Sequence, residues 1–363
     1  MILTESAAPK PSLGQWLRHP AWAPLNDAAA WQRLATAINP LWSLGEVRAR
    51  VVRNVIETPH VRSLWLKPNR HFRGFQPGQH LMLELEIAGV RHSRCYSLSA
   101  APRRDGLLRL TIKAKDRGLV SIAAHRLEPG QIVRISQASG DFAPKVSTAP
   151  LLMISAGSGI TPMLSILDGH ANTAATTDIC LIHGARDSGD WIGADELKQR
   201  ALQLPGLKIH FHGSAESGRL RAQDLHTLVP DWADRNALLC GPDDFMQAVE
   251  VHYAEAGLSS RLQSESFGRR AALIDTDAST HAITHGKPKQ MFTANSGQSL
   301  LEAAEAAGLQ PRFGCRRGIC MSCQCRKHSG TVKNLLTGQL SSPGEELIQL
   351  CISTPQSAVE LAL

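Results

Sequence analysis

The sequence predicts a multidomain protein in which an antiparallel β-barrel, a parallel α/β domain and a small α+β domain follow one another. Its 363 residues are more than one ordinary hydrophobic core accommodates. Short strands with alternating apolar residues fill the first part, and continuous apolar runs alternate with helical stretches from about residue 150. We place the boundaries at 1–45 for an N-terminal extension, 46–146 for the barrel, 147–265 for the α/β domain, 266–281 for a linker and 282–363 for the last domain.

The N-terminal extension is rich in tryptophan. It holds four of the seven tryptophans (Trp16, Trp22, Trp31 and Trp42), and its segment NDAAAWQRLATAIN predicts a helix that ends before Pro40. Indoles favour surfaces that are half in water, so the extension could contact a membrane surface or a membrane protein. The alternative is that these indoles pack on the protein's own barrel.

Six β runs predict the barrel. They are VRARVVRNVIET, VRSLWLKP, HLMLELEIAG, SRCYSLSA, LLRLTIKAK and QIVRISQ, and the turns PGQH and EPGQ punctuate them. Short strands at this spacing, separated by Pro and Gly turns, are typical of a small antiparallel barrel.

The next domain has the rhythm of repeated βαβ units. LLMISAG predicts a buried strand that leads through a glycine turn into the helix SGITPMLSILDG. DICLIHGAR, LKIHFHG and NALLCGP predict further buried strands, and DDFMQAVEVHYAEAG predicts a helix between strands. Continuous apolar strands of this kind indicate a parallel sheet that is covered on both faces.

The last domain carries a cluster of cysteines. Cys315, Cys320 and Cys323 are spaced C-x4-C-x2-C, and Cys351 follows far downstream. This is the spacing of plant-type [2Fe–2S] centres, whereas zinc would favour paired C-x2-C units or histidines. In a strand, Cys325 points to the same face as Cys323. Cys325 is therefore either a spare ligand or, as we expect, a small buried apolar residue.

The motifs of the three domains together resemble a known family. The last domain looks like a plant-type ferredoxin with a β-grasp fold. RCYS (94–97) and GLVS (118–121) in the barrel, and AGSGITP (156–162), CGP (240–242) and ESF (265–267) in the α/β domain, resemble the ferredoxin–NADP reductase superfamily. The order of domains is that of bacterial reductases with a C-terminal ferredoxin domain. The resemblance implies an FAD-binding barrel and a Rossmann-like NAD(P)-binding domain.

The resemblance also implies roles for individual residues. Arg94, Tyr96, Ser97, Gly118 and Ser121 would hold FAD, with Phe267 close to the flavin, although related reductases can hold FMN. Gly157, Gly159, Thr161, Pro162, Cys240, Gly241 and Pro242 would bind the pyridine nucleotide, to which we add Arg186 from its place after the second strand of the α/β domain. Tyr96, Ser97 and Cys240 would be the catalytic residues, and Cys315, Cys320, Cys323 and Cys351 the cluster ligands. His80, His92 and His125 lie near the flavin motifs in sequence and could line the site.

The identity of the nucleotide depends on the segment HGARDSGD. An acidic residue after the second strand selects the ribose hydroxyls of NADH, whereas arginine accommodates the 2′-phosphate of NADPH. Arg186 and Asp187 stand side by side here, and Arg219 and Arg221 add positive charge nearby. We therefore expect NADPH rather than NADH.

The predicted function is electron transfer from NAD(P)H through FAD and a [2Fe–2S] cluster to a partner protein. The N-terminal extension and the cysteine loop look most like those of reductases that serve membrane fatty-acyl desaturases. Alternatives are the reductase component of an aromatic-ring or alkane oxygenase and, from another class, a redox-sensing or carrier module without turnover. Reduction of cytochrome c by NAD(P)H would distinguish a reductase from the carrier module, which would not catalyse it.

Composition and charge limit the location and the partners. No apolar stretch reaches the ~18 residues of a membrane-spanning helix. The start MILTESAAPKPSLGQW lacks the basic and apolar regions of a secretory signal, so we expect a cytoplasmic protein or a peripheral one at the inner face of the membrane. The net charge is +7, but the positive residues are scattered, which argues against a nucleic-acid partner.

Overall fold

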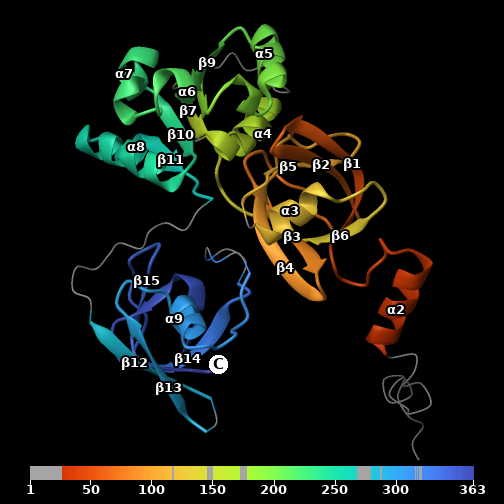
Figure 1. Ribbon diagram of the computed structural model, residues 1–363, viewed down its shortest axis with the longest axis vertical. Helices are drawn as coiled ribbons and strands as arrows, with labels where there is room; N and C mark the ends of the chain where they lie inside the picture. The colour runs from red at the N-terminus through yellow and green to blue at the C-terminus, as the bar shows by residue number, and fades with distance from the viewer. Residues whose placement is uncertain are drawn as a thin grey trace, which may run out of the picture.

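The computed structural model describes residues 27–116, 118–144, 150–171, 178–267, 279–286, 288–314, 316, 318 and 321–363. Figure 1 shows three separate bodies in chain order: an orange barrel, a green α/β domain and a blue C-terminal domain. The short helix α2 lies beside the barrel in the same view. This confirms the predicted fold class.

The first domain is a six-stranded antiparallel barrel. Its strands are β1 (Arg48–Thr58), β2 (Val61–Pro68), β3 (His80–Ile87), β4 (Val90–Ser97), β5 (Leu108–Lys113) and β6 (Ile132–Ile135). They lie in the order β4-β3-β6-β1-β2-β5. A bridge between Leu98 and Leu110 joins the two edge strands and closes the sheet. Helix α3 (Leu119–His125) packs Val120 and Ala124 against the core of the barrel.

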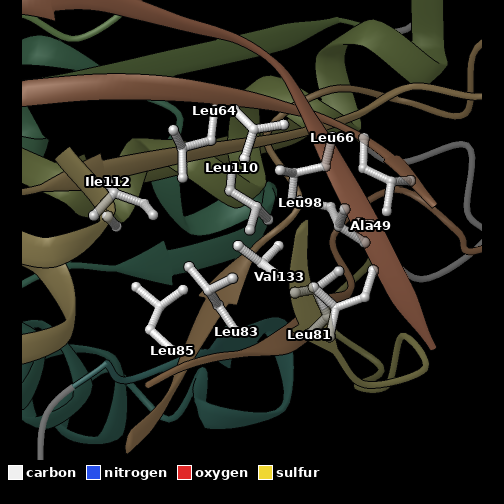
Figure 2. Packing of buried hydrophobic residues seen from close by; sticks show 14 of the residues in the cluster. Ala49, Leu64, Leu66, Leu81, Leu83, Leu85, Leu98, Leu110, Ile112 and Val133 are labelled. Carbon is white, nitrogen blue, oxygen red and sulfur yellow. The ribbon is translucent and has the colours of Figure 1, made fainter. Parts of the chain in front are cut away.

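Alternation of side chains explains why these runs close around one core. Leu81, Leu83 and Leu85 follow one another at every second position of β3 and point inward, where they meet Leu64 and Leu110 (Figure 2). Successive side chains of a strand point to opposite faces, so a period of two places one apolar row inside. Glu84, which lies between Leu83 and Leu85, and Glu86, which follows Leu85, are not buried.

The second domain has a parallel sheet of five strands. These are β7 (Leu151–Ala156), β8 (Ile179–Ala185), β9 (Leu207–Gly213), β10 (Asn236–Cys240) and β11 (Leu262–Ser264), in the order β11-β10-β7-β8-β9. Its longer helices are α4 (Ile160–Ala171), α5 (Ala194–Gln203) and α8 (Asp243–Glu255), with the short α6 (Ser214–Ser217) and α7 (Leu225–Leu228). Neighbouring residues of β7 enter different cores, because Met153 packs with α4 and α5 whereas Leu152 packs with α8. Both faces of the sheet are therefore covered, as predicted.

The third domain has a mixed β-grasp sheet. It contains β12 (Thr280–His285), β13 (Gln290–Asn295), β14 (Gln324–Ser329), β16 (Glu346–Gln349) and β18 (Val359–Leu361), in the order β13-β12-β18-β14-β16, and β15 (Val332–Asn334) pairs with β17 (Ser353–Pro355). Helix α9 (Leu300–Ala306) begins with a capping box, in which the Ser299 hydroxyl and the Glu302 carboxylate each accept a backbone N–H of the other residue. Strand β12 begins within the stretch that we interpreted as a linker, and residues 268–278 of that stretch lie outside the described residues.

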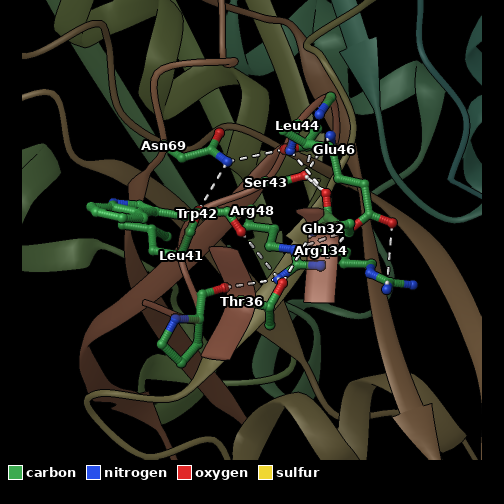
Figure 3. A network of polar contacts seen from close by, with 12 residues as sticks. Gln32, Thr36, Leu41, Trp42, Ser43, Leu44, Glu46, Arg48, Asn69 and Arg134 are labelled. Atoms are coloured by element: carbon green, nitrogen blue, oxygen red, sulfur yellow. Dashed lines mark hydrogen bonds and ion pairs between the residues drawn. The ribbon is translucent and has the colours of Figure 1, made fainter. Parts of the chain in front are cut away.

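A polar network fixes the N-terminal segment to the barrel (Figure 3). Helix α2 (Ala28–Ile38) forms where the sequence predicts it. The buried Arg48 of β1 donates to the Pro40 carbonyl at 2.9 Å and to the Thr36 hydroxyl at 3.2 Å. Trp31 and Trp42 nevertheless remain 44% and 53% exposed. Trp16 and Trp22 lie outside the described residues, so the two alternatives for the extension stay open.

Among the residues described, no helix is both long enough and apolar enough to cross a membrane.

Candidate functional site

A cavity of about 260 Å³ opens between the barrel and the α/β domain. Strand β4 contributes Arg94, Tyr96 and Ser97 to its wall, and the turn before α3 contributes Gly118 and Ser121. All five are residues that we predicted to hold FAD. The predicted residues Thr161 and Phe267 also line the cavity. The structure thus brings together residues that lie up to 173 positions apart, from Arg94 to Phe267.

The chemistry of the cavity wall fits a flavin nucleotide. The hydroxyl oxygen of Ser97 is buried and has no hydrogen-bond partner among the described residues, so it is available to a bound ring. Burial raises the pKa of Tyr96, which keeps its phenol neutral and suited to packing against a planar ring. At Gly118 an added Cβ would lie 2.5 Å from the Ser121 hydroxyl and 2.9 Å from the Lys115 carbonyl oxygen, so a side chain there would displace the turn.

The two nucleotide motifs meet at the ends of β7 and β10. The turn Gly157–Gly159 connects β7 to α4, and Cys240 at the end of β10 pairs with Ser155 of β7. The backbone of Gly159 packs so closely on the Cys240 carbonyl oxygen that an added Cβ would lie 2.0 Å from it. Strand β10 continues into Gly241 and into Pro242, the N-cap of α8, so these predicted nucleotide residues lie at one edge of the parallel sheet. In doubly wound folds this edge is where nucleotides bind.

Arg186 follows β8 at the same edge of the sheet. Its neighbour Asp187 already caps a short turn, because its side chain accepts the Gly189 N–H at 2.9 Å. Arg221 is engaged with Asp224 at 3.1 Å. Asp187, the acidic residue that would select NADH, thus uses one carboxylate oxygen to cap its own turn.

Two of the four predicted cluster ligands, Cys323 and Cys351, lie side by side in the C-terminal domain. The sulfur of Cys323, just before β14, lies 3.1 Å from the sulfur of Cys351, 28 residues later. A disulfide would require about 2.05 Å, so these are two separate thiols that one metal ion could bridge. Cys315 and Cys320 lie outside the described residues. The thiol of Cys325 instead contacts the Arg326 carbonyl at 3.6 Å.

Arg316 was not predicted as a site residue, yet it lies in the wall of the flavin cavity. It belongs to the cysteine loop, adopts a left-handed φ of 58°, and pairs with Glu305 at 2.8 Å. Its guanidinium also lies 3.9 Å from the ring centre of Phe313. Ser322 of the same loop faces the barrel in a second cavity. The loop that carries the cysteines therefore adjoins the flavin cavity.

The sequence did not predict that His80 and Glu265 form a buried pair. His80 Nδ1 lies 3.1 Å from a carboxylate oxygen of Glu265. Burial opposes protonation of His80, but the neighbouring Cys95 and Glu265 outweigh it and raise the pKa of His80 to about 9. Of the other histidines, His125 bonds the Ile112 carbonyl at 2.7 Å, and neither it nor His92 is in the described lining of the cavity.

The raised pKa of His80 predicts a loss of stability at alkaline pH. The folded value of about 9 exceeds the unfolded value of 6.5, so the contribution is complete below pH 6.5 and disappears as the pH rises through 9. At most roughly 3 kcal/mol is lost over this window. Thermal unfolding between pH 6 and about 9.5 measures it. His80→Gln, which cannot titrate, should show a flatter dependence, and equal slopes in the two proteins would contradict the assignment.

Comparisons with known proteins agree with this architecture. Residues 49–143 match the oxidoreductase FAD-binding domain, 153–251 the oxidoreductase NAD-binding domain and 283–356 the 2Fe-2S iron-sulfur cluster binding domain. An NADPH oxidoreductase of Mycobacterium tuberculosis is 33% identical over 95% of this chain and 93% of its own. A glycine betaine monooxygenase reductase subunit of Chromohalobacter salexigens is 30% identical over 88% and 96%. The solved structure of phthalate dioxygenase reductase has the same fold, with a TM-score of 0.60 at 21% identity over 88% of this chain and 98% of its own.

The fold and the three sites define a flavin- and iron–sulfur-dependent oxidoreductase. The chain belongs to the ferredoxin–NAD(P) reductase family, in the group whose members carry a C-terminal [2Fe–2S] domain. It is an enzyme that passes electrons from NAD(P)H through FAD to a [2Fe–2S] cluster. This confirms the predicted class, and the alternative of a carrier module without turnover does not fit it.

Proposed function

We propose that this reductase supplies electrons to a terminal oxygenase. The observation that carries the proposal is the position of Arg316, because the cysteine loop already adjoins the flavin cavity within one chain. Electrons therefore need no separate ferredoxin and can leave from the C-terminal domain to a partner protein. The name of the Chromohalobacter relative, a monooxygenase reductase subunit, supports an oxygenase as that partner.

We assign the roles in the flavin cavity as follows. The Arg94 guanidinium binds phosphate in a fork, and the turn at Gly118 and Ser121 provides a second phosphate contact. The neutral ring of Tyr96 packs on the flavin ring, and the unpaired Ser97 hydroxyl hydrogen-bonds to it. When bound, FAD accepts the two electrons of a hydride and releases them one at a time. Phe267 closes the cavity from the α/β domain.

The nucleotide and cluster residues have corresponding roles. Gly157 and Gly159 form the turn that receives the pyrophosphate, and Thr161 and Pro162 lie in the first turn of α4 beside it. The Thr161 hydroxyl stabilises this arrangement by donating to the Ser158 carbonyl at 2.9 Å. Cys240, followed by Gly241 and Pro242, places the nicotinamide. Cys315, Cys320, Cys323 and Cys351 ligate the [2Fe–2S] cluster, which delivers single electrons at low potential when present.

Reconstitution tests the proposed acceptor. The purified reductase is mixed with candidate terminal oxygenases and NADPH, and product formation is measured together with NADPH consumption. We expect at least one oxygenase to turn over in proportion to the reductase, and omission of the reductase to abolish product. Failure with every oxygenase, together with turnover of a membrane acyl desaturase under the same conditions, would overturn the proposal.

The acyl desaturase predicted from the sequence remains the second candidate. The observation that favours it is the exposed apolar surface of the N-terminal segment, where Leu34, Ile38 and Leu44 are 50%, 64% and 55% exposed beside Trp31 and Trp42. Such a surface suits a membrane interface. Sedimentation with phospholipid vesicles measures this contact, and replacement of Trp42 and Ile38 by glutamine should weaken it.

We expect the enzyme to prefer NADPH, and Arg186 to carry much of that preference. A charge-assisted bond from Arg186 to the 2′-phosphate stabilises only NADPH, so Arg186→Gln should lower kcat/KM for NADPH about tenfold and leave NADH within about twofold. Steady-state kinetics with both nucleotides measures this. Lys198→Gln, at an exposed cation of the same domain, is the matched control. Equal losses with NADH and NADPH would contradict the role of Arg186.

A further inference from the structure

The contact between His80 and Glu265 joins the barrel to the α/β domain beside the flavin cavity. The two side chains are only 6% and 11% exposed, so the contact is shielded from water. His80 lies at the start of β3, and Glu265 directly follows β11. The second carboxylate oxygen of Glu265 is buried and has no hydrogen-bond partner among the described residues. The contact with His80 therefore offsets the free-energy cost of burying this carboxylate.

Contacts with Ser139 and Gly140 restrict the position of the His80 ring. The backbones of His80 and Ser139 exchange two hydrogen bonds of 3.0 and 2.9 Å. The Ser139 hydroxyl lies 3.3 Å from Nε2 of the ring, opposite the nitrogen that contacts Glu265. Gly140 packs against the ring, and an added Cβ there would lie 2.8 Å from it. Ser139 thus contacts the Nε2 atom of His80, and the Nδ1 atom of the same ring faces Glu265.

Both partners of the contact lead directly to predicted site residues. His80 is the register partner of Ser97 across β3 and β4, so the two lie side by side on one face of the sheet. The Glu265 N–H donates to the Leu239 carbonyl at 2.9 Å, next to Cys240. The following residue, Ser266, donates to the Asp243 carboxylate at 2.6 Å, and Phe267 then enters the flavin cavity.

We propose that His80 is a positioning residue for reduction of the flavin by NAD(P)H: by holding the Glu265 carboxylate, it fixes Phe267 in the flavin cavity and aligns the end of β10 with Ser97. The contact between His80 and Glu265 lies outside the cavity, but it determines the positions of the side chains that face the reacting atoms. Because catalysis depends on placement within about an ångström, loosening this contact lowers the rate more than it weakens binding of the nucleotide.

The charge of the pair agrees with this role. Glu265 and Cys95 are the titratable groups that face His80 from the neighbouring elements, and their influence outweighs burial and raises the pKa of His80 to about 9. The imidazole is therefore protonated at neutral pH and forms an ion pair with the carboxylate. An ion pair in a buried place is harder to replace than a neutral hydrogen bond, because loss of one partner leaves a buried charge.

The test uses the holoenzyme and three variants at the contact. His80→Leu removes the donor, His80→Gln keeps an N–H donor of similar reach, and Glu265→Gln removes the charge of the acceptor. Ferricyanide takes electrons from the flavin, so its reduction by NADPH reports flavin reduction apart from the cluster. FAD content and the visible circular dichroism of the flavin report binding and local geometry. Glu196→Gln is the matched control, because Glu196 joins the same two domains through Arg109 at 2.7 Å.

We expect His80→Leu to lower kcat about tenfold, to leave KM for NADPH within about twofold and to change the flavin circular dichroism. His80→Gln should recover most of the rate, and Glu265→Gln should resemble His80→Leu. The double variant His80→Leu/Glu265→Gln should be no slower than the slower single variant, because both changes break one interaction. Glu196→Gln should keep kcat within about twofold.

Three results would overturn the proposal. The first is a wild-type kcat and flavin spectrum in His80→Leu that carries its full FAD. The second is a raised KM with unchanged kcat, which would indicate nucleotide binding rather than positioning. The third is an equal loss in Glu196→Gln, which would assign the effect to any loosened domain contact. If His80→Leu does not retain FAD, His80→Gln and Glu265→Gln decide: a slower Glu265→Gln supports the proposal, and wild-type rates in both refute it.

Discussion

Replacing Cys351 with serine removes the [2Fe–2S] cluster and with it electron delivery to one-electron acceptors. Cys351 places its sulfur 3.1 Å from that of Cys323, so its thiolate is positioned to share a metal ion. Changes outside the ligand shell already cost roughly 10–100-fold in metal affinity, so loss of a ligand should cost at least as much. We expect the visible bands and the electron paramagnetic resonance signal of the reduced cluster to disappear, and cytochrome c reduction to fall about 100-fold or more.

Two controls separate loss of the cluster from loss of the fold. Ferricyanide reduction should persist in Cys351→Ser, because the flavin cavity lies in the other two domains except for Arg316. Cys325→Ser is the matched variant, since Cys325 is buried in the same hydrophobic core and its thiol contacts the Arg326 carbonyl. It should keep the cluster. A normal cluster in Cys351→Ser would contradict the assignment of Cys351 as a ligand. Loss of the cluster in Cys325→Ser would indicate that Cys325 is a ligand.

The long elements of the fold were predictable because each carries its own periodicity. Strand β3 alternates apolar and polar residues over most of its length, whereas β7 is apolar except for Ser155. This difference distinguishes a barrel strand from a buried parallel strand before any partner is known. The short strands β11 and β15, of three residues each, carry no such signal. They are strands only because β10 and β17 lie beside them.

The candidate site divides in the same way. Residues in local motifs, such as Arg94 and Gly159, can be proposed from sequence because the turn or strand around them is local. Arg316 could not be found like this, because its place in the cavity depends on how the C-terminal domain meets the barrel. The same holds for His80 and Glu265, which are 185 residues apart and lie in different domains. Contacts between domains leave no periodic pattern in either partner.

Replacing Gly159 with alanine should disable reduction by NADPH while leaving FAD bound. An added Cβ would lie 2.0 Å from the Cys240 carbonyl oxygen and 2.4 Å from its carbon, and both belong to backbone that cannot rotate away. The turn and the end of β10 must therefore separate by an ångström or more. A displacement of that size can cost about 100-fold in rate, so we expect kcat/KM for NADPH to fall by about that factor. Unfavourable packing should also lower stability by roughly 1–3 kcal/mol.

Anaerobic stopped-flow reduction by NADPH measures the first effect and thermal unfolding the second. Gly184→Ala is the matched control, because Gly184 lies in β8 of the same sheet and its added Cβ would make only ordinary contacts, the nearest at 3.5 Å from Leu220. Its rate of reduction by NADPH should stay within about twofold of the wild type. Its free energy of unfolding should stay within about 1 kcal/mol of the wild type. FAD content should be unchanged in both, since Gly159 does not line the flavin cavity. Wild-type reduction in Gly159→Ala would mean that the turn and the end of β10 can separate without harm, and that their close packing does not position the nucleotide.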